Sequence, residues 1–242
     1  MDDRVLEVVN RSNQRGGRML SVVDLIDAGT LTLEQAAVLT ARIEAGSSVL
    51  VGANPGGAGK TAVMGAVVTM LPPGESIHVT HTGRGFAFGG AGRSETWRNA
   101  GSGDCLVAYE ISPGSYEAYI RDEDVRVFLE RGLAGARLIT NLHADTLEQA
   151  RDQIVGDNGA TPAEFNAFDT FVPITVTGGS GGLSRVVEQI DYREGNGWSW
   201  YGRSPALSGR GGEIAAFLEG LVADRTRRIE EVRRRWLEFV NG

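Results

Sequence analysis

One stretch decides the fold of this chain: Ser47-Ser48-Val49-Leu50-Val51-Gly52-Ala53-Asn54-Pro55-Gly56-Gly57-Ala58-Gly59-Lys60-Thr61. It begins with an apolar run typical of a buried strand. A glycine-rich segment follows, and then an apolar segment that predicts a helix from about Lys60 to just before Pro72. A strand, a glycine-rich turn, Gly-Lys-Thr and a helix together indicate a phosphate-binding loop. The backbone N–H groups of such a loop surround an anion, and the helix dipole adds partial positive charge. An ordinary glycine-rich turn is the alternative interpretation.

We expect this loop to bind ATP and Mg²⁺. The ammonium group of Lys60 would neutralise the β and γ phosphates, and the hydroxyl group of Thr61 would hold the metal ion. The full pattern has a glycine where this chain has Asn54, a residue type that tolerates left-handed backbone better than most. The predicted nucleotide-binding residues are Asn54, Pro55, Gly56, Gly57, Ala58, Gly59, Lys60, Thr61 and Ala62.

The choice of basic residues supports the loop prediction. The chain has 24 basic side chains, and Lys60 is the only lysine among them. A planar guanidinium and a compact ammonium are not interchangeable where a phosphate chain must be reached from a tight loop. Arginine therefore supplies positive charge everywhere except at the position where the predicted site requires an ammonium group.

Composition excludes several classes of protein. The 242 residues are 41% hydrophobic, which suffices for one large α/β domain with a sizeable core. The net charge of −7 argues against nucleic acid as a partner. One cysteine excludes an intramolecular disulfide framework and a cysteine-based zinc site. No apolar run approaches the ~20 residues of a membrane span, and the first residues do not resemble a secretory signal. We therefore expect a soluble, cytoplasmic protein.

Strands alternate with helices beyond the loop. Three further apolar runs predict buried strands, at residues 77–82, 105–110 and 136–142. The alternation predicts an α/β fold with a mostly parallel central sheet and helices on both faces. Ligands of such sheets bind beyond the carboxyl ends of the strands. The phosphate loop, Glu110 and His143 all fall at that edge.

Glu110 and His143 are therefore candidate catalytic residues, together with Lys60. A carboxylate at this edge can hold Mg²⁺ through water or orient the attacking water. A histidine there can sense the γ phosphate or stabilise transferred charge. The alternatives are a surface carboxylate and a structural, hydrogen-bonding histidine. The candidates for contacting a phosphate, within the chain or across a subunit boundary, are Arg84, Arg93 and Arg98.

Local signals predict several further elements. Ser21 and Thr32 begin capping-box patterns and should each open a short helix. Residues 171–177 and 183–192 flank a Gly-Ser-Gly-Gly turn, which predicts a C-terminal antiparallel hairpin.

The main domain is predicted to span residues 21–205. Residues 1–20 predict a short strand followed by a linker, and residues 206–242 predict a linker and one long amphipathic helix from 213 to 240. The arginines of this helix either form a solvated face over a packed stripe or contact a partner or lipid headgroups.

The sequence resembles the secretion ATPases of the type II/type IV superfamily, which include the pilus and archaellum assembly motors. The likeness covers about residues 20–195 and is greatest to the archaeal branch. The phosphate loop is similar to the family's Walker A motif. The other segments that carry the resemblance are the lead-in at 24–31, the approach to the second strand at 71–77, the Walker B strand at 104–110, the histidine box Thr140-Asn141-Leu142-His143-Ala144-Asp145-Thr146 and the closing strand at 185–190.

This resemblance implies a RecA-like P-loop ATPase domain that forms a hexameric ring with ATP between its subunits. The ring would lie on the cytoplasmic side of a membrane, peripheral to it. It would act on a membrane platform or filament-assembly protein. By position, Lys60 and Thr61 would bind phosphates and Mg²⁺, Glu110 would be the Walker B acid, and His143 would be the histidine-box residue.

Two positions depart from the family pattern. The family's second strand ends in an acidic pair whose glutamate activates water, whereas this chain has Thr80 and His81 there. Loss of a positioned general base lowers a rate by about 10²–10⁴-fold. Tyr109 replaces the glycine that normally precedes the Walker B glutamate.

Two functions fit these observations. The chain is either an ATP-hydrolysing motor subunit of a secretion or pilus-type system, or a nucleotide-binding module with little or no hydrolysis. A small-molecule kinase or a nucleic-acid-dependent ATPase is disfavoured by the histidine box and by the acidic charge balance.

Overall fold

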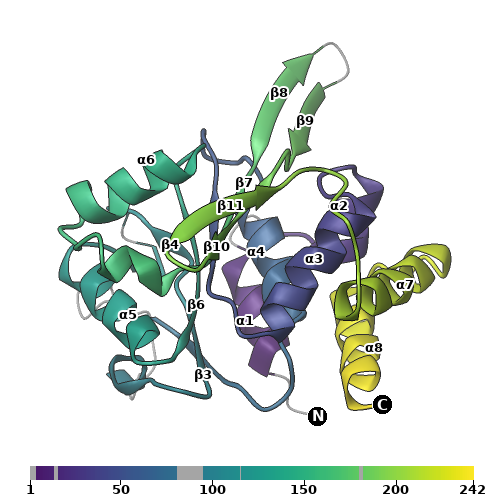
Figure 1. Ribbon diagram of the computed structural model, residues 1–242, viewed down its shortest axis with the longest axis horizontal. Helices are drawn as coiled ribbons and strands as arrows, with labels where there is room; N and C mark the ends of the chain where they lie inside the picture. Colours follow the sequence, from purple (N-terminus) through teal and green to yellow (C-terminus); the bar gives the residue numbers. More distant parts are fainter. Residues whose placement is uncertain (1–3, 14–15, 81–94, 115, 180–181) are drawn as a thin grey trace.

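A seven-stranded sheet lies at the centre of the computed structural model, which describes residues 4–13, 16–80, 95–114, 116–179 and 182–242 (Figure 1). Within those ranges its strand order is β11 (Gly197–Tyr201), β10 (Ile190–Glu194), β7 (Thr170–Pro173), β1 (Val49–Gly52), β6 (Arg137–Leu142), β3 (Asp104–Val107) and β2 (Ser76–Val79). The five strands from β7 to β2 are parallel, and β10 and β11 extend the sheet in antiparallel pairing. Two strand pairs lie outside it, namely β4 (Glu110–Ile111) with β5 (Tyr119–Ile120), and β8 (Thr175–Gly179) with β9 (Gly182–Val186).

Helices cover both faces of the sheet, as predicted (Figure 1). The core on one face includes α1 (Arg4–Ser12), α2 (Val22–Asp27), α3 (Leu33–Glu44) and α4 (Lys60–Thr69), with α7 (Arg210–Ala223) and α8 (Ile229–Asn241) packed on the outer side of these helices. The other face packs against η1 (Glu95–Asn99), α5 (Glu123–Leu133), α6 (Leu147–Asp152), η2 (Gln153–Asp157) and η3 (Glu164–Ala167). The expectation of a mixed α/β fold with a mostly parallel sheet is confirmed.

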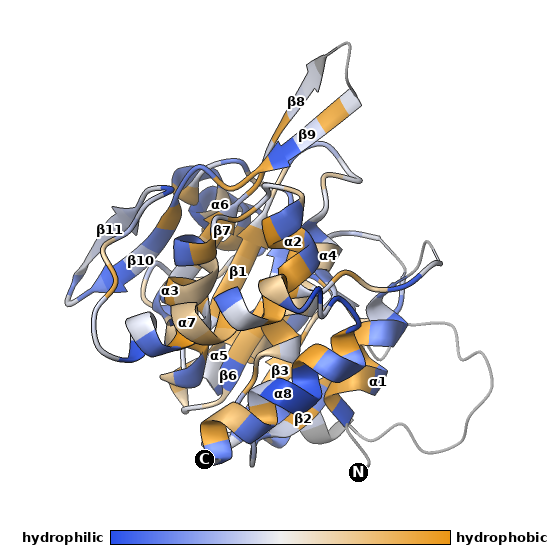
Figure 2. Cartoon of the chain, turned by 90° about the vertical axis from the view of Figure 1, so that its right-hand side faces the viewer, coloured by the Kyte–Doolittle hydropathy of each residue, from blue (hydrophilic) through white to orange (hydrophobic). Residues whose placement is uncertain are grey.

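The central strand is apolar on both sides because both of its faces are covered. Val49 and Val51 belong to the core on the α4 side, and Leu50 belongs to the core on the α5 side. Successive side chains of a strand point to opposite faces, so a strand between two helical layers requires apolar residues at every position. Figure 2 shows β1 as a hydrophobic strand between those layers.

The two capping boxes form as predicted. The side chain of Ser21 accepts a hydrogen bond from the Asp24 amide, and that of Thr32 accepts one from the Gln35 amide. In each case the side chain of the third helical residue returns a bond to the cap backbone. Gly46 follows α3 with φ of 103°, a backbone conformation that favours glycine.

The N-terminal segment is a helix, so the prediction of a strand there was wrong. Val5, Val8, Val9 and Ser12 of α1 are buried, and this spacing places them on one helical face. The helix lies against α4, where Gly65 permits close packing, since a Cβ atom at Gly65 would meet Val9 at 3.3 Å. The valine-rich run resembled a strand because it is short and β-branched.

The tail contains two helices, so the prediction of one long helix was also wrong. The chain turns between α7 and α8, where Arg225 has φ of 54°. The turn lets α7 pack on α3 while α8 packs on α4, and Trp236 of α8 is fully buried. Arg233 is buried as well and donates to the Thr69 carbonyl at the end of α4. Arg234 forms ion pairs with two glutamates of its own helix, and the outer side of α8 is largely hydrophilic (Figure 2).

The C-terminal strands differ from the predicted hairpin. Its expected first arm is divided at Pro173, so that β7 pairs with β1 in the main sheet and only β8 continues into a hairpin with β9. The second arm is divided in the same way, because β10 returns to β7 and pairs with β11, a strand that the sequence did not predict. The strand predicted at 105–110 is likewise interrupted after Val107, and Glu110 belongs to β4. Each predicted strand is interrupted at the point where the polypeptide leaves the central sheet.

Candidate functional site

The chain between β1 and α4 forms an open loop at the carboxyl edge of the sheet. Gly57 and Gly59 have φ of 88° and 100°, a backbone region in which other residues are strained. Within the described ranges, the loop amides that donate to no backbone or side-chain acceptor are those of Gly56, Gly57, Ala58, Gly59 and Thr61. Unpaired amides at the start of a helix form a binding site for an anion.

Two contacts determine how the loop leaves the sheet. A Cβ atom at Gly52 would lie 2.4 Å from the Ala144 carbonyl oxygen, so only glycine allows β1 to end this close to the neighbouring chain. The carboxylate of Asp145 accepts hydrogen bonds from the backbone amide of Asn54 at 2.8 Å and from its side chain at 3.3 Å. Asn54 is not among the described residues with positive φ. The tolerance of asparagine for left-handed backbone is therefore not used at this position, and its side chain is held by Asp145.

Lys60, Glu110 and His143 meet beside the loop, as the sequence predicted. The Lys60 ammonium lies 3.7 Å from Glu110 Oε2 and 3.3 Å from His143 Nδ1, and it donates to the Ala53 carbonyl at 3.3 Å. His143 Nε2 lies 2.9 Å from Glu110 Oε1. The side chains of Lys60 and Glu110 are buried, whereas that of His143 is 37% exposed.

The Glu110 carboxylate lies beside both of the other groups. An ionised carboxylate only accepts hydrogen bonds, so the imidazole is the donor in its short contact through His143 Nε2. The Lys60 ammonium lies at nearly equal distances from the two ring nitrogens, 3.3 Å from Nδ1 and 3.4 Å from Nε2, and therefore packs against the ring. Glu110 is thus shared between Lys60 and His143.

A cavity of about 970 Å³ opens beside this network. It is lined on one side by the loop and by Lys60, Thr61 and Glu110, and on another by the chain between α1 and α2. A cavity of this size is typical of small-molecule sites. The structure therefore provides room for a ligand against the unpaired amides.

The oxygen donors of the site fit magnesium. The Thr61 hydroxyl and the Glu110 carboxylate both line the cavity, and hard oxygen ligands of this kind suit Mg²⁺, which keeps several waters and phosphate oxygens in its shell. The described residues hold no cluster of three or more His, Cys, Asp or Glu side chains. A metal ion at this place would consequently depend on a phosphate ligand as well as on the protein.

The two departures from the family pattern have different structural consequences. Thr80 follows β2, and its hydroxyl oxygen is buried without a hydrogen-bond partner among the described residues. His81 lies outside those residues. The phenol group of Tyr109 donates to the Val8 carbonyl at 3.0 Å, and burial raises its pKa. Tyr109 thus fastens α1 to the chain next to Glu110.

Of the three candidate arginines, the structure describes Arg98, and it does not bring this residue to the loop. Arg98 forms an ion pair with Asp124 and lies 4.7 Å from the centre of the Trp97 ring, and it does not line the cavity. Arg84 and Arg93 lie outside the described residues. The sequence analysis did not assign Asp145 to the site, although its position two residues after His143 was a signal for doing so.

Comparisons with known proteins add no identification. A search against family models found no match, and a search of curated proteins also found none. Of the helices in the described ranges, none combines the length and the apolar character needed to cross a lipid bilayer.

Proposed function

We propose that this chain binds ATP with Mg²⁺ through the loop at residues 54–62 and hydrolyses it as a RecA-like P-loop ATPase. One observation carries the proposal. The unpaired amides of the loop and the only lysine of the chain face the same cavity at the carboxyl edge of a parallel sheet. Ligands of open α/β sheets bind at that edge.

Each residue of the network has a defined task in this proposal. Lys60 exchanges its contact with Glu110 for the β and γ phosphates and neutralises their charge. Glu110, released from Lys60, accepts a hydrogen bond from the attacking water and orients it. His143 holds the Glu110 carboxylate through Nε2. Thr61, and Glu110 through water, would hold Mg²⁺, which would supply Lewis-acid polarisation of the phosphates.

A nucleotide-binding module with little or no hydrolysis is the second candidate. Thr80, the residue after β2, stands where the secretion ATPases have an acidic pair. The buried hydroxyl group of Thr80 cannot act as a base at neutral pH. Among the described residues, Glu117 is the other carboxylate that lines the cavity, and it is paired with Arg11. We therefore assign turnover in this site to Glu110.

We also propose how the chain assembles and where in the cell it acts. By its likeness to the secretion and pilus motors, the chain would form a hexameric ring at the cytoplasmic face of a membrane. The ring would act on a membrane platform or filament-assembly protein, without nucleic acid.

Steady-state ATP hydrolysis tests the proposal. Wild type and Lys60→Ala are compared, with binding of a fluorescent ATP analogue and molecular mass measured with and without nucleotide. We expect binding and turnover in the wild type and loss of both in the variant. Equal activity of the two proteins would reject the ATPase, whereas binding without turnover in an assembled ring would establish the module.

A further inference from the structure

The β8–β9 hairpin leaves the sheet directly beside the phosphate loop. Pro173 at the end of β7 is paired with Gly52 at the end of β1, and the next residue, Ile174, donates its amide to the Gly52 carbonyl at 2.8 Å. The hairpin continues from this point and projects beyond the rest of the molecule (Figure 1). Its return is anchored where the Val187 amide donates to the Thr30 carbonyl at 2.9 Å.

Arg185 of β9 lies over the loop from this side. Its Nη2 donates to the Gly57 carbonyl at 3.4 Å, at the long end of hydrogen-bond distances. A Cβ atom at Gly59 would lie 3.1 Å from Cδ of Arg185, so the aliphatic part of this side chain covers Gly59. The side chain is only partly buried and does not line the large cavity.

Three other basic residues near the loop have carboxylate partners: Lys60 has Glu110, Arg11 has Glu117, and Arg18 has Asp24. Among the described residues, no carboxylate pairs with Arg185, whose one recorded partner is the Gly57 carbonyl. An arginine held by a single long bond has a planar face and several N–H donors available to a ligand.

The order of the strands indicates how a bound nucleotide is oriented along the loop. β1 lies between β7 and β6, so the loop that follows it has the hairpin on one side and His143 on the other. The reacting, terminal phosphate must lie with Lys60, Glu110 and His143, on the β6 side. The large cavity adjoins this same end, because Tyr109, Ser112 and Tyr119, which precede or follow Glu110, line it. The opposite end of an extended nucleotide then lies on the β7 side, beneath Arg185.

We propose that Arg185 binds the nucleoside end of the nucleotide, with its guanidinium plane stacked on the base. This inference rests on the proposed nucleotide site and adds to it the place of the base. Guanidinium groups stack on flat rings and attract their π electrons. Because Arg185 belongs to β9, an occupied site adds a contact that holds the base of the hairpin against the loop.

Equilibrium binding of ATP, ADP and inorganic tripolyphosphate distinguishes this role from a structural one. We expect Arg185→Ala to weaken the binding of ATP and of ADP by the same factor of about ten, since this factor corresponds to about 1.4 kcal/mol, within the range of a cation stacked on a ring. Tripolyphosphate, which has no base, should bind the variant as it binds the wild type. If the alanine variant melts at a lower temperature, Arg185→Lys replaces it, with a smaller loss for the nucleotides and again none for tripolyphosphate.

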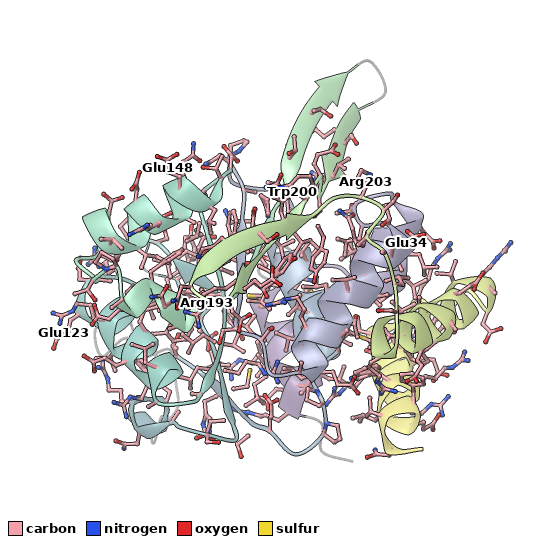
Figure 3. The ribbon with its side chains drawn as sticks, viewed as in Figure 1. Glu34, Glu123, Glu148, Arg193, Trp200 and Arg203 are labelled. Carbon is pink, nitrogen blue, oxygen red and sulfur yellow. The ribbon has the colours of Figure 1, made fainter. Side chains whose placement is uncertain are left out.

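Two control variants complete the experiment. Arg193→Ala removes an arginine of β10 (Figure 3) and should bind all three ligands normally. Tyr116→Ala removes a ring that is 64% exposed and lines the large cavity, and it should also be neutral. Weaker nucleotide binding in Tyr116→Ala with normal binding in Arg185→Ala would place the base in the cavity and overturn the inference.

Further outcomes also decide the question. An equal loss for tripolyphosphate and for ATP in the Arg185 variants would show that Arg185 acts only on the loop or its phosphates, and would reject the base site. Hydrogen exchange in the wild type should slow at residues 182–186 when ADP saturates the protein, and unchanged exchange there would reject the link to the hairpin. A wild type that binds neither ATP nor tripolyphosphate would instead reject the proposed function itself.

Discussion

Replacing Glu110 by glutamine tests the buried network most directly. The Lys60 ammonium is 5% exposed and lies 3.7 Å from Glu110 Oε2. At an effective dielectric constant of about 20, two unit charges at this distance attract each other by about 4.5 kcal/mol. Part of this energy is recovered, because the Ala53 carbonyl and the new amide oxygen still accept from Lys60. We expect Glu110→Gln to lower the free energy of unfolding by about 2–3 kcal/mol.

A melting experiment measures this loss. For a chain of this length, 1 kcal/mol corresponds to about 2–4 °C, so the melting temperature of the nucleotide-free variant should fall by about 4–12 °C. Saturating Mg-ATP should raise it more in the variant than in the wild type, because the phosphates replace the missing negative charge beside Lys60. Hydrolysis should fall by about 10²–10⁴-fold.

Glu117→Gln is the matched control. Glu117 lines the same cavity, but its ion pair with Arg11 is partly exposed on both sides and contributes less than about 1 kcal/mol. The control should melt within about 2 °C of the wild type and retain its hydrolysis. A Glu110→Gln protein that melts like this control, or that hydrolyses ATP at the wild-type rate, would refute the reasoning.

Three further predictions concern the rest of the fold. Tyr109→Phe removes the hydrogen bond to the Val8 carbonyl and should lower stability by about 1 kcal/mol, seen as faster hydrogen exchange in α1. The Cys105 thiol should react with a thiol reagent only as the protein unfolds, because burial excludes the reagent and raises the thiol pKa. Burial raises the pKa of Asp24, but hydrogen bonds from Arg18 and Ser21 outweigh it and leave this pKa below its usual range. Asp24→Asn should therefore be less stable than the wild type at pH 7, with the difference disappearing as the pH falls through the lowered pKa.

Each of these predictions has a result that contradicts it. Unchanged exchange in α1 would show that Tyr109 does not hold that helix. Labelling of Cys105 in the native protein at the rate of a free thiol would show that β3 opens locally. A constant stability difference between the wild type and Asp24→Asn from pH 7 to about pH 2 would exclude the ionised carboxylate as its cause.

Features that depend on a few neighbouring residues were predictable from the sequence. The capping boxes at Ser21 and Thr32 formed because a side chain and an amide three positions apart can satisfy each other whatever surrounds them. The strand before the loop and the helix from Lys60 were equally clear, because β1 is apolar at every position and α4 follows a glycine-rich turn. The parallel order of these elements then placed Glu110 and His143 at one edge.

Features that depend on packing were not predictable in the same way. Arg4–Ser12 has a β-branched composition and becomes helical because α4 offers a groove at Gly65. The tail bends at Arg225 because two helices reach the core where one straight helix could not. The strand β11 was missed because its partner, β10, is supplied by the folded sheet.

The sequence by itself determined that a glycine-rich turn with one lysine joins a buried strand to a helix, because backbone sterics and local hydrogen bonds act over a few residues. Only the tertiary structure decided what surrounds that turn. Asp145 holds Asn54 from 91 positions away, and Arg185 reaches Gly57 from 128 positions away. Such contacts exist only after the sheet has assembled, because the entropy of the open chain keeps these groups apart until many apolar residues are buried together.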